Sequence, residues 1–425
     1  MTSEVLIMNE DCIAITADSA VTVGSKTFKA DKIFELSDTQ PISIMIYGNA
    51  SISNVSASLI IKEYRAQLKG KKFKTVSDCA KDFLNFLEKG GGRSLKTNPL
   101  ITRERIDQRV MYCCNELLKG FLRELDDIFF GRNITEDDGE SELEIEEIMD
   151  SIVNRSKNTE DPSVDEKAAG KMYDILKENE DICEMIASFP YYRGKPEDLL
   201  SILSCVLVSK NRIRSPTGIV IAGYGSEDVY PSYVELIVNG VFYDGLNYHV
   251  QSEVKIGVDR PSWIEAFAQD DVVQTYLYGL DPDLFGGMEN NIRHMLDALT
   301  NTLFEILEGD DKKLEEIKRL NKRNVERYME RFQDHCEKYY LRPTEEAICH
   351  LSKDEMASMA ESLVNFTSLK RHVSNDLDSV GGPVDVAIIS KSEGFVWVKR
   401  KYYFDISLNP YYTERRRDQH GGGKK

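Results

Sequence analysis

The feature that most constrains the fold of this chain is the separation of its strand-like segments by long helical ones. Short apolar runs with turn residues between them occupy residues 3–48, 218–250 and 384–400, a pattern typical of antiparallel strands. Between these segments, residues 49–217 and 261–372 carry apolar side chains at helical spacing or alternating charges. We therefore predict an α+β fold in which antiparallel meanders are interrupted by large helical regions.

Three local patterns add detail to this prediction. A helix is expected to begin near Thr102, because apolar residues then recur every three to four positions, at Ile106, Val110, Cys113, Leu117, Phe121 and Leu125. Within the second strand segment, the Asn239-Gly240 pair is a strong indicator of a two-residue hairpin turn. The acidic stretch 135–150 is interpreted as a solvated helix face with a flexible lead-in.

The composition excludes several classes of protein. With 425 residues, 41% of them hydrophobic and 30% charged, the chain is expected to be globular and soluble. It lacks the run of about 18 apolar residues that a membrane helix needs, so no membrane partner is expected. A net charge of -18 disfavours a nucleic-acid partner. The opening residues lack a secretory signal and the eight cysteines are scattered, which together predict a cytoplasmic protein with reduced thiols.

One residue stands out within the first strand segment. Asp18 lies in the apolar run AITADSAVT, where an ionised carboxylate is costly unless a cation or several hydrogen-bond donors satisfy it. Lys32, fourteen positions later in KIFEL, is the candidate partner, because residues 21–30 can reverse the chain direction. The alternative is an ordinary surface ion pair, worth roughly 0 to 1 kcal/mol.

The N-terminus adds a candidate nucleophile. Thr2 is small enough for Met1 to be removed, which would leave a threonine with a free α-amine. Such an amine has a pKa of roughly 7.7 to 8 and can act as general base for the hydroxyl of its own residue. A neighbouring Lys32 would lower the proton affinity of the amine, and Asp18 would hold the lysine in place.

These residues resemble the opening of proteasome β-type subunits and of the related bacterial peptidase HslV, which are N-terminal-nucleophile (Ntn) hydrolases. In that family an aspartate follows the nucleophilic threonine after sixteen positions, and Thr2 and Asp18 differ by 18 - 2 = 16. Lys32 matches the active-site lysine of the family, with a loop two residues shorter. Gly48, in IMIYGNAS, matches the glycine whose N–H forms the oxyanion hole. Ser19 and Thr22, in ADSAVT, match a segment that contacts substrate.

The resemblance implies a four-layer αββα sandwich of two antiparallel sheets with inserted helices. It divides the chain into Ntn-core segments 2–90, 215–260 and 355–402, helical insertions 91–214 and 261–354, and a basic tail 403–425. The distal aspartate and serine that orient the threonine amine in the family have no clean counterparts. Asp378 and Ser379 lie one position from an ungapped match, so amine positioning stays open.

The implied activity is threonine-type hydrolysis of peptide bonds in a polypeptide substrate. Homo-oligomerisation and an ATP-dependent unfoldase partner are further expectations from the family, and the basic tail is a candidate docking peptide. Two alternatives remain, namely a non-catalytic proteasome-like assembly subunit and a small-molecule amidase of the same superfold. No cofactor is expected. The pairs His335-Cys336 and Cys349-His350 are not expected to bind a metal, because adjacent ligands on one helix diverge.

Overall fold

The computed structural model describes residues 3–23, 26–37, 39–89, 101–132, 139–159, 161–210, 215–243, 245–306, 311–373, 381–402, 404 and 408–409. The pattern of contacts divides the chain into two compact units. The first unit comprises residues 1–43, 222–232 and 254–425, and the second comprises residues 44–221 and 233–253. Within the described ranges, no helix combines the length and the apolar character needed to cross a membrane.

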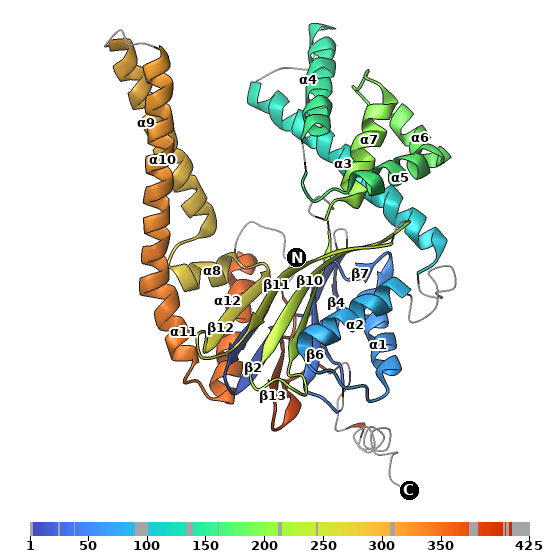
Figure 1. Cartoon of the computed structure of the whole chain (residues 1–425), viewed down its shortest axis with the longest axis vertical. Coiled ribbons are helices and arrows are strands. Elements are labelled where there is room, and N and C mark those ends of the chain that lie inside the picture. The colour runs from blue at the N-terminus through green and yellow to red at the C-terminus, as the bar shows by residue number, and fades with distance from the viewer. Residues whose placement is uncertain are drawn as a thin grey trace. The chain divides into compact units, whose positions relative to one another are not determined.

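A five-stranded antiparallel sheet forms the centre of the first unit (Figure 1). Its strands, in spatial order, are β12 (Ser262–Ala268), β1 (Ser3–Asn9), β2 (Cys12–Ala17), β13 (Asp385–Ser390) and β14 (Gly394–Lys399). The central strands β1 and β2 are buried along their whole length, which explains why both read as continuous apolar runs. Both faces of the sheet are therefore covered at its centre.

Helices cover one face of this sheet. Helix α12 (Lys353–Val373) packs against β1, β2 and β13, beside α8 (Asp271–Tyr278), while α11 (Arg342–Ile348) lies against β12. Val5 and Ile7 of β1 belong to the resulting apolar core. Because side chains alternate along a strand, Glu4 and Leu6 point to the opposite face.

Strand β12 corrects the sequence-based prediction of a helical region from Pro261 onwards. Residues 262–268, SWIEAFA, contain good helix formers, yet they form the edge strand that pairs with β1, with Phe267 opposite Glu4. Pairing with a long apolar strand satisfies the backbone of this segment, and tertiary context of this kind overrides local propensity.

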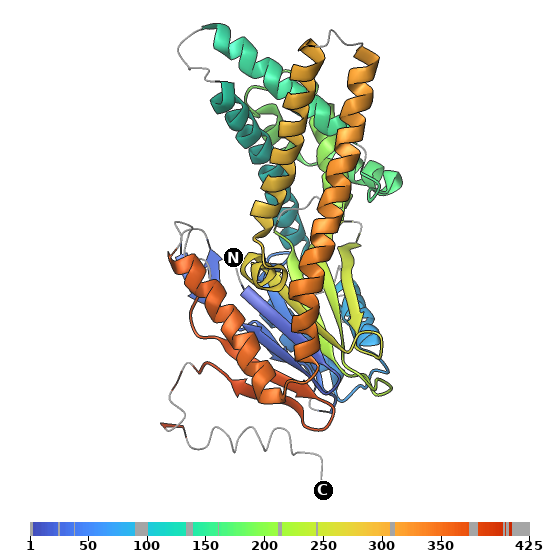
Figure 2. The same ribbon diagram turned by 90° about the vertical axis from the view of Figure 1, so that its left-hand side faces the viewer.

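Two long helices that follow β12 pack side by side (Figure 2). They are α9 (Pro282–Ile306) and α10 (Asp311–Cys336). A hydrogen bond of 2.7 Å from the amide of Asn321 to the hydroxyl of Thr300 marks the side on which they face each other. The π-helix η2 (Glu337–Leu341) joins α10 to α11.

A second five-stranded sheet lies mostly in the second unit. Its spatial order is β11 (Gly245–Lys255), β10 (Ser232–Phe242), β9 (Thr217–Gly223), β6 (Ile42–Gly48) and β5 (Ile33–Glu35). Two short antiparallel pairs accompany the sheets, β3 (Ala20–Val23) with β4 (Lys26–Lys29) and β7 (Ser51–Ile52) with β8 (Val55–Ser56).

The predicted Asn239-Gly240 turn is wrong, because both residues lie inside β10 and the chain reverses only between Phe242 and Gly245. The Asn239 amide donates to the carbonyl of Lys210 at 3.1 Å and to the Asn247 side chain at 2.9 Å. These hydrogen bonds join β10 to Lys210 and to β11, and they outweigh the local turn preference of the Asn-Gly pair.

The remaining helices of the second unit are α1 (Ala57–Leu68), α2 (Val76–Lys89), α3 (Arg103–Arg132), α4 (Gly139–Asn158), α5 (Glu166–Lys177), α6 (Glu180–Ala187) and α7 (Pro196–Val208). The helix predicted near Thr102 is confirmed as α3. Its predicted stripe is buried at Ile106, Val110, Cys113, Phe121 and Leu125. Helices α3, α4, α5 and α7 pack on one another in this unit.

Candidate active site

Asp18 lies directly after β2 and is 1% exposed. Its carboxylate accepts backbone N–H bonds from Ser3 at 3.1 Å, Ala20 at 3.2 Å and Gly381 at 3.0 Å. These three donors come from the start of β1, the start of β3 and the segment before β13. Backbone donors stabilise the ionised form of a buried carboxylate, so the local fold accounts for an acidic residue in this apolar environment.

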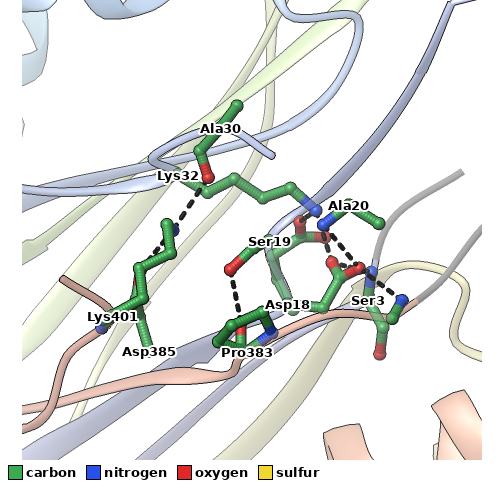
Figure 3. A network of polar contacts seen from close by, with 11 residues as sticks. Ser3, Asp18, Ser19, Ala20, Ala30, Lys32, Pro383, Asp385 and Lys401 are labelled. Atoms are coloured by element: carbon green, nitrogen blue, oxygen red, sulfur yellow. Dashed lines mark hydrogen bonds and ion pairs between the residues drawn. The ribbon is translucent and has the colours of Figure 1, made fainter. Parts of the chain in front are cut away.

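Lys32 supplies the cation that the sequence predicts for Asp18. The lysine is 3% exposed, and its ammonium forms an ion pair with Asp18 (Figure 3). The same ammonium lies 3.1 Å from a carboxylate oxygen of Glu4, which is fully buried. The interpretation as a surface ion pair is therefore wrong, and the described cluster consists of one buried cation between two carboxylates.

Sequence reasoning missed Glu4, although a signal for it was present. The residue lies in the run SEVLIM, whose other members are apolar or small, so the argument applied to Asp18 applies equally here. On β1 it points away from α12, toward the face of the sheet on which Lys32 lies. A search for every charged residue in an apolar strand would have found it.

A second ion pair holds the segment that carries Lys32. The ammonium of Lys401 donates to Asp385 at 2.6 Å and to the backbone carbonyl of Ala30 at 2.9 Å (Figure 3). The backbone N–H of Lys401 also donates to Asp385, at 2.7 Å. The N–H of Ala30 donates to the carbonyl of Ser19 at 2.9 Å. Ala30 is thus tied on two sides, two residues before Lys32.

The predicted substrate-contacting residues lie beside Asp18. Ser19 is fully buried, and its hydroxyl donates to the carbonyl of Pro383 (Figure 3). The side chain therefore links the end of β2 to the segment before β13. Thr22 lies on β3, opposite Thr27 in the β3–β4 pair. Thr2, Asp378 and Ser379 lie outside the described residues.

Gly48, the predicted oxyanion donor, ends β6 in the second unit. Its φ of +71° lies in the left-handed region, and a Cβ atom at this position would lie 2.7 Å from the carbonyl oxygen of Pro216. Both facts exclude other residue types without strain. The sequence therefore needs glycine here for backbone reasons alone, whatever its N–H binds.

The cluster of Glu4, Asp18 and Lys32 can supply a fixed electrostatic field but is not itself a nucleophilic centre. A buried lysine ammonium between two carboxylates is preorganised and needs no water to hold it. Among the residues that the structure describes, no group of three or more His, Cys, Asp or Glu side chains is arranged to bind a metal ion. A nucleophile would have to come from a neighbouring position.

Comparisons with known proteins leave the family open. No family model matches the sequence, and no curated protein matches it. Among solved structures, a mutant of Anbu from Hyphomicrobium sp. strain MC1 aligns over 100% of this chain and 99% of that chain, with 9% identity and a TM-score of 0.29. A likeness at this level supports no conclusion, so the function is argued from the site itself.

Proposed function

We propose that this protein is a proteasome-like threonine hydrolase that cleaves peptide (amide) bonds with Thr2 as nucleophile once Met1 has been removed. One observation carries the proposal. Asp18, ion-paired with buried Lys32, also accepts the backbone N–H of Ser3 at 3.1 Å. Thr2 precedes Ser3 in the sequence, so its carbonyl carbon is bonded to that same nitrogen. The charged cluster is therefore anchored one peptide bond from the proposed nucleophile.

The proposed reaction needs no group beyond this chain and water. The hydroxyl oxygen of Thr2 attacks the substrate carbonyl, and the hydroxyl proton passes to the free α-amine of the same residue. The amine then gives a proton to the leaving nitrogen, which departs as the acyl-enzyme ester forms. A water molecule, deprotonated by the amine, hydrolyses the ester and restores the hydroxyl. The proposal assigns Lys32 the role of the nearby cation, because positive charge close to an amine lowers its proton affinity.

The proposal includes the four-layer αββα sandwich. Its support within the first unit is that β1 and β2 are buried on both faces, although α12 covers only one of them. Strand β5, which belongs to the first unit, contacts β2. The role of Gly48 as the oxyanion donor stays a prediction from the sequence.

The first test is the N-terminus of the purified protein. Intact-mass measurement and N-terminal sequencing should find a chain that begins at Thr2. Hydrolysis of a panel of fluorogenic peptides should then be lost in Thr2→Ala and retained in Thr2→Ser, the matched variant that keeps a hydroxyl. Retention of Met1 on all molecules, or equal hydrolysis by Thr2→Ala, would contradict the proposal.

A substrate-size series defines the proposed substrate class. The protein should hydrolyse an unfolded polypeptide and long peptides at least as fast as a single-residue amide. This result would support a polypeptide substrate. Hydrolysis of small amides alone would indicate an amidase with the same nucleophile. Native mass spectrometry of the same sample tests the proposed homo-oligomer.

A further inference from the structure

A cavity of about 370 Å³ lies in the first unit, and Glu4, Asp18 and Lys32 do not line it. It follows the edge strand β12 and is bordered by α8, the start of α9, the region where α10 meets η2, and α11. Volumes of this size are typical of small-molecule sites. The wall is mostly aliphatic and aromatic, and six of its side chains determine what it can bind, namely Trp263, Glu265, Asp270, Tyr278, Phe285 and Glu345.

Three aromatic rings contribute to the wall from three different elements. Trp263 comes from β12, Tyr278 from the end of α8, and Phe285 from the first turn of α9. The faces of such rings attract cations, and groups of them recognise ammonium ligands. Trp263 already holds one cation, because the guanidinium carbon of Arg260 lies 4.7 Å from its ring centroid. The indole thus already pairs with a cation in this environment.

The charged side chains that line the cavity are all carboxylates, from Glu265, Asp270 and Glu345. Glu265 accepts a hydrogen bond of 3.1 Å from the indole of Trp263. Burial raises the pKa of Asp270 despite its hydrogen bond from Gln274. Burial also raises the pKa of Glu345, against the opposing attraction of Arg260 and Arg342. A cation inside the cavity would offset the cost of keeping these groups ionised.

From this combination we propose that the cavity binds a small organic cation, an amine or quaternary ammonium group attached to an apolar body. The aromatic and aliphatic wall takes the apolar body, and the carboxylates take the positive charge. The three carboxylates disfavour an anionic ligand of the same shape, although Arg260 and Arg342 lie near Glu345. The proposal is independent of the hydrolytic function, since it uses neither Thr2 nor Lys32.

The cavity contains its own reporter for a test. Of the two tryptophans in the chain, Trp263 lines the cavity, while Trp397 lies on β14 at the opposite edge of the same sheet. In a full-length Trp397→Phe protein, titration with benzyltrimethylammonium should change the Trp263 fluorescence saturably. The anion benzylsulfonate should bind at least tenfold more weakly or not at all.

Variants locate the site. In the same Trp397→Phe background, Asp270→Asn should weaken benzyltrimethylammonium binding by about tenfold, which corresponds to 1.4 kcal/mol. Ala266→Phe should abolish binding by filling the cavity. The matched control is Asp283→Asn, which removes the same charge from an exposed position of α9 outside the cavity wall and should leave binding unchanged.

Four outcomes would overturn the proposal. Two concern the wild-type cavity: no saturable fluorescence change with benzyltrimethylammonium, or equally tight binding of benzylsulfonate. Two concern the variants: Asp270→Asn and Asp283→Asn weaken benzyltrimethylammonium binding equally, or binding is unchanged in an Ala266→Phe protein that circular dichroism shows to be folded. If Ala266→Phe does not fold, the comparison of the two aspartate variants decides the question.

Discussion

Replacing Lys32 by methionine tests the central electrostatic argument about the site. The substitution removes the cation and leaves Glu4 and Asp18 as buried carboxylates, 0% and 1% exposed. Removing one partner of a buried ion pair costs about 3 to 5 kcal/mol. Because Lys32 contacts two carboxylates, we expect Lys32→Met to lower the free energy of unfolding by about 5 kcal/mol, the upper end of that range.

Urea denaturation followed by tryptophan fluorescence measures this loss. Trp263 and Trp397 both belong to the first unit, so the signal reports the part of the chain that holds the cluster. The matched control is Lys399→Met, because Lys399 pairs with Glu361 at the surface, with side-chain exposures of 54% and 27%. Exposed pairs of this kind contribute roughly 0 to 1 kcal/mol.

A second substitution distinguishes electrostatics from lost packing. In the Lys32→Met background, Glu4→Gln removes one of the two carboxylates that have lost their cation and should recover about 0.5 to 3 kcal/mol, the range in which residues of one network couple. If Lys32→Met costs no more than Lys399→Met, or if Glu4→Gln is further destabilising in that background, the account of two carboxylates sharing one buried cation is refuted.

Three further predictions concern other parts of the molecule. Gly48→Ala should lower the thermal midpoint, because a left-handed φ costs a non-glycine residue roughly 1 to 2 kcal/mol and the added Cβ atom meets a carbonyl oxygen at 2.7 Å; an unchanged midpoint would contradict this. Lys401→Met should reduce hydrolysis by the proposed enzyme while Lys401→Arg retains most of it, since the ammonium joins Asp385 to the segment before the active-site lysine; equal rates in both variants would exclude a positioning role. Burial opposes ionisation of Asp271, but hydrogen bonds from Lys370 and Arg371 on α12 bring its pKa below the usual 3.8. Its stabilising contribution is therefore complete above the usual pKa and is lost as the pH falls through the lower folded value, so Asp271→Asn should flatten the loss of stability in acid; an unchanged acid profile would count against it.

Much of the first sheet could be predicted from local pattern. The runs that became β1, β2, β13 and β14 are short, apolar and bounded by turn residues, and such segments carry their own signal. The edge strand β12 was not predicted in this way, because SWIEAFA mixes helix-favouring Glu and Ala with strand-favouring Trp, Ile and Phe, and pairing with β1 decides its structure. The prediction of a turn at Asn239-Gly240 was also wrong. The Asn239 side chain bonds to Lys210 and Asn247, and β10 runs extended through this local turn signal.

The candidate site, too, was predicted only in part from the sequence. By itself the sequence indicated that Asp18 needs a cation or several hydrogen-bond donors and that Lys32 is close enough along the chain to supply the cation, because a charge in an apolar strand has few ways to be satisfied. Only the tertiary structure decided that Glu4 shares that cation and that Lys401 binds the carbonyl of Ala30, 371 positions earlier. Contacts over such separations depend on how strands order and register in a sheet, and neither spacing nor composition encodes that order locally.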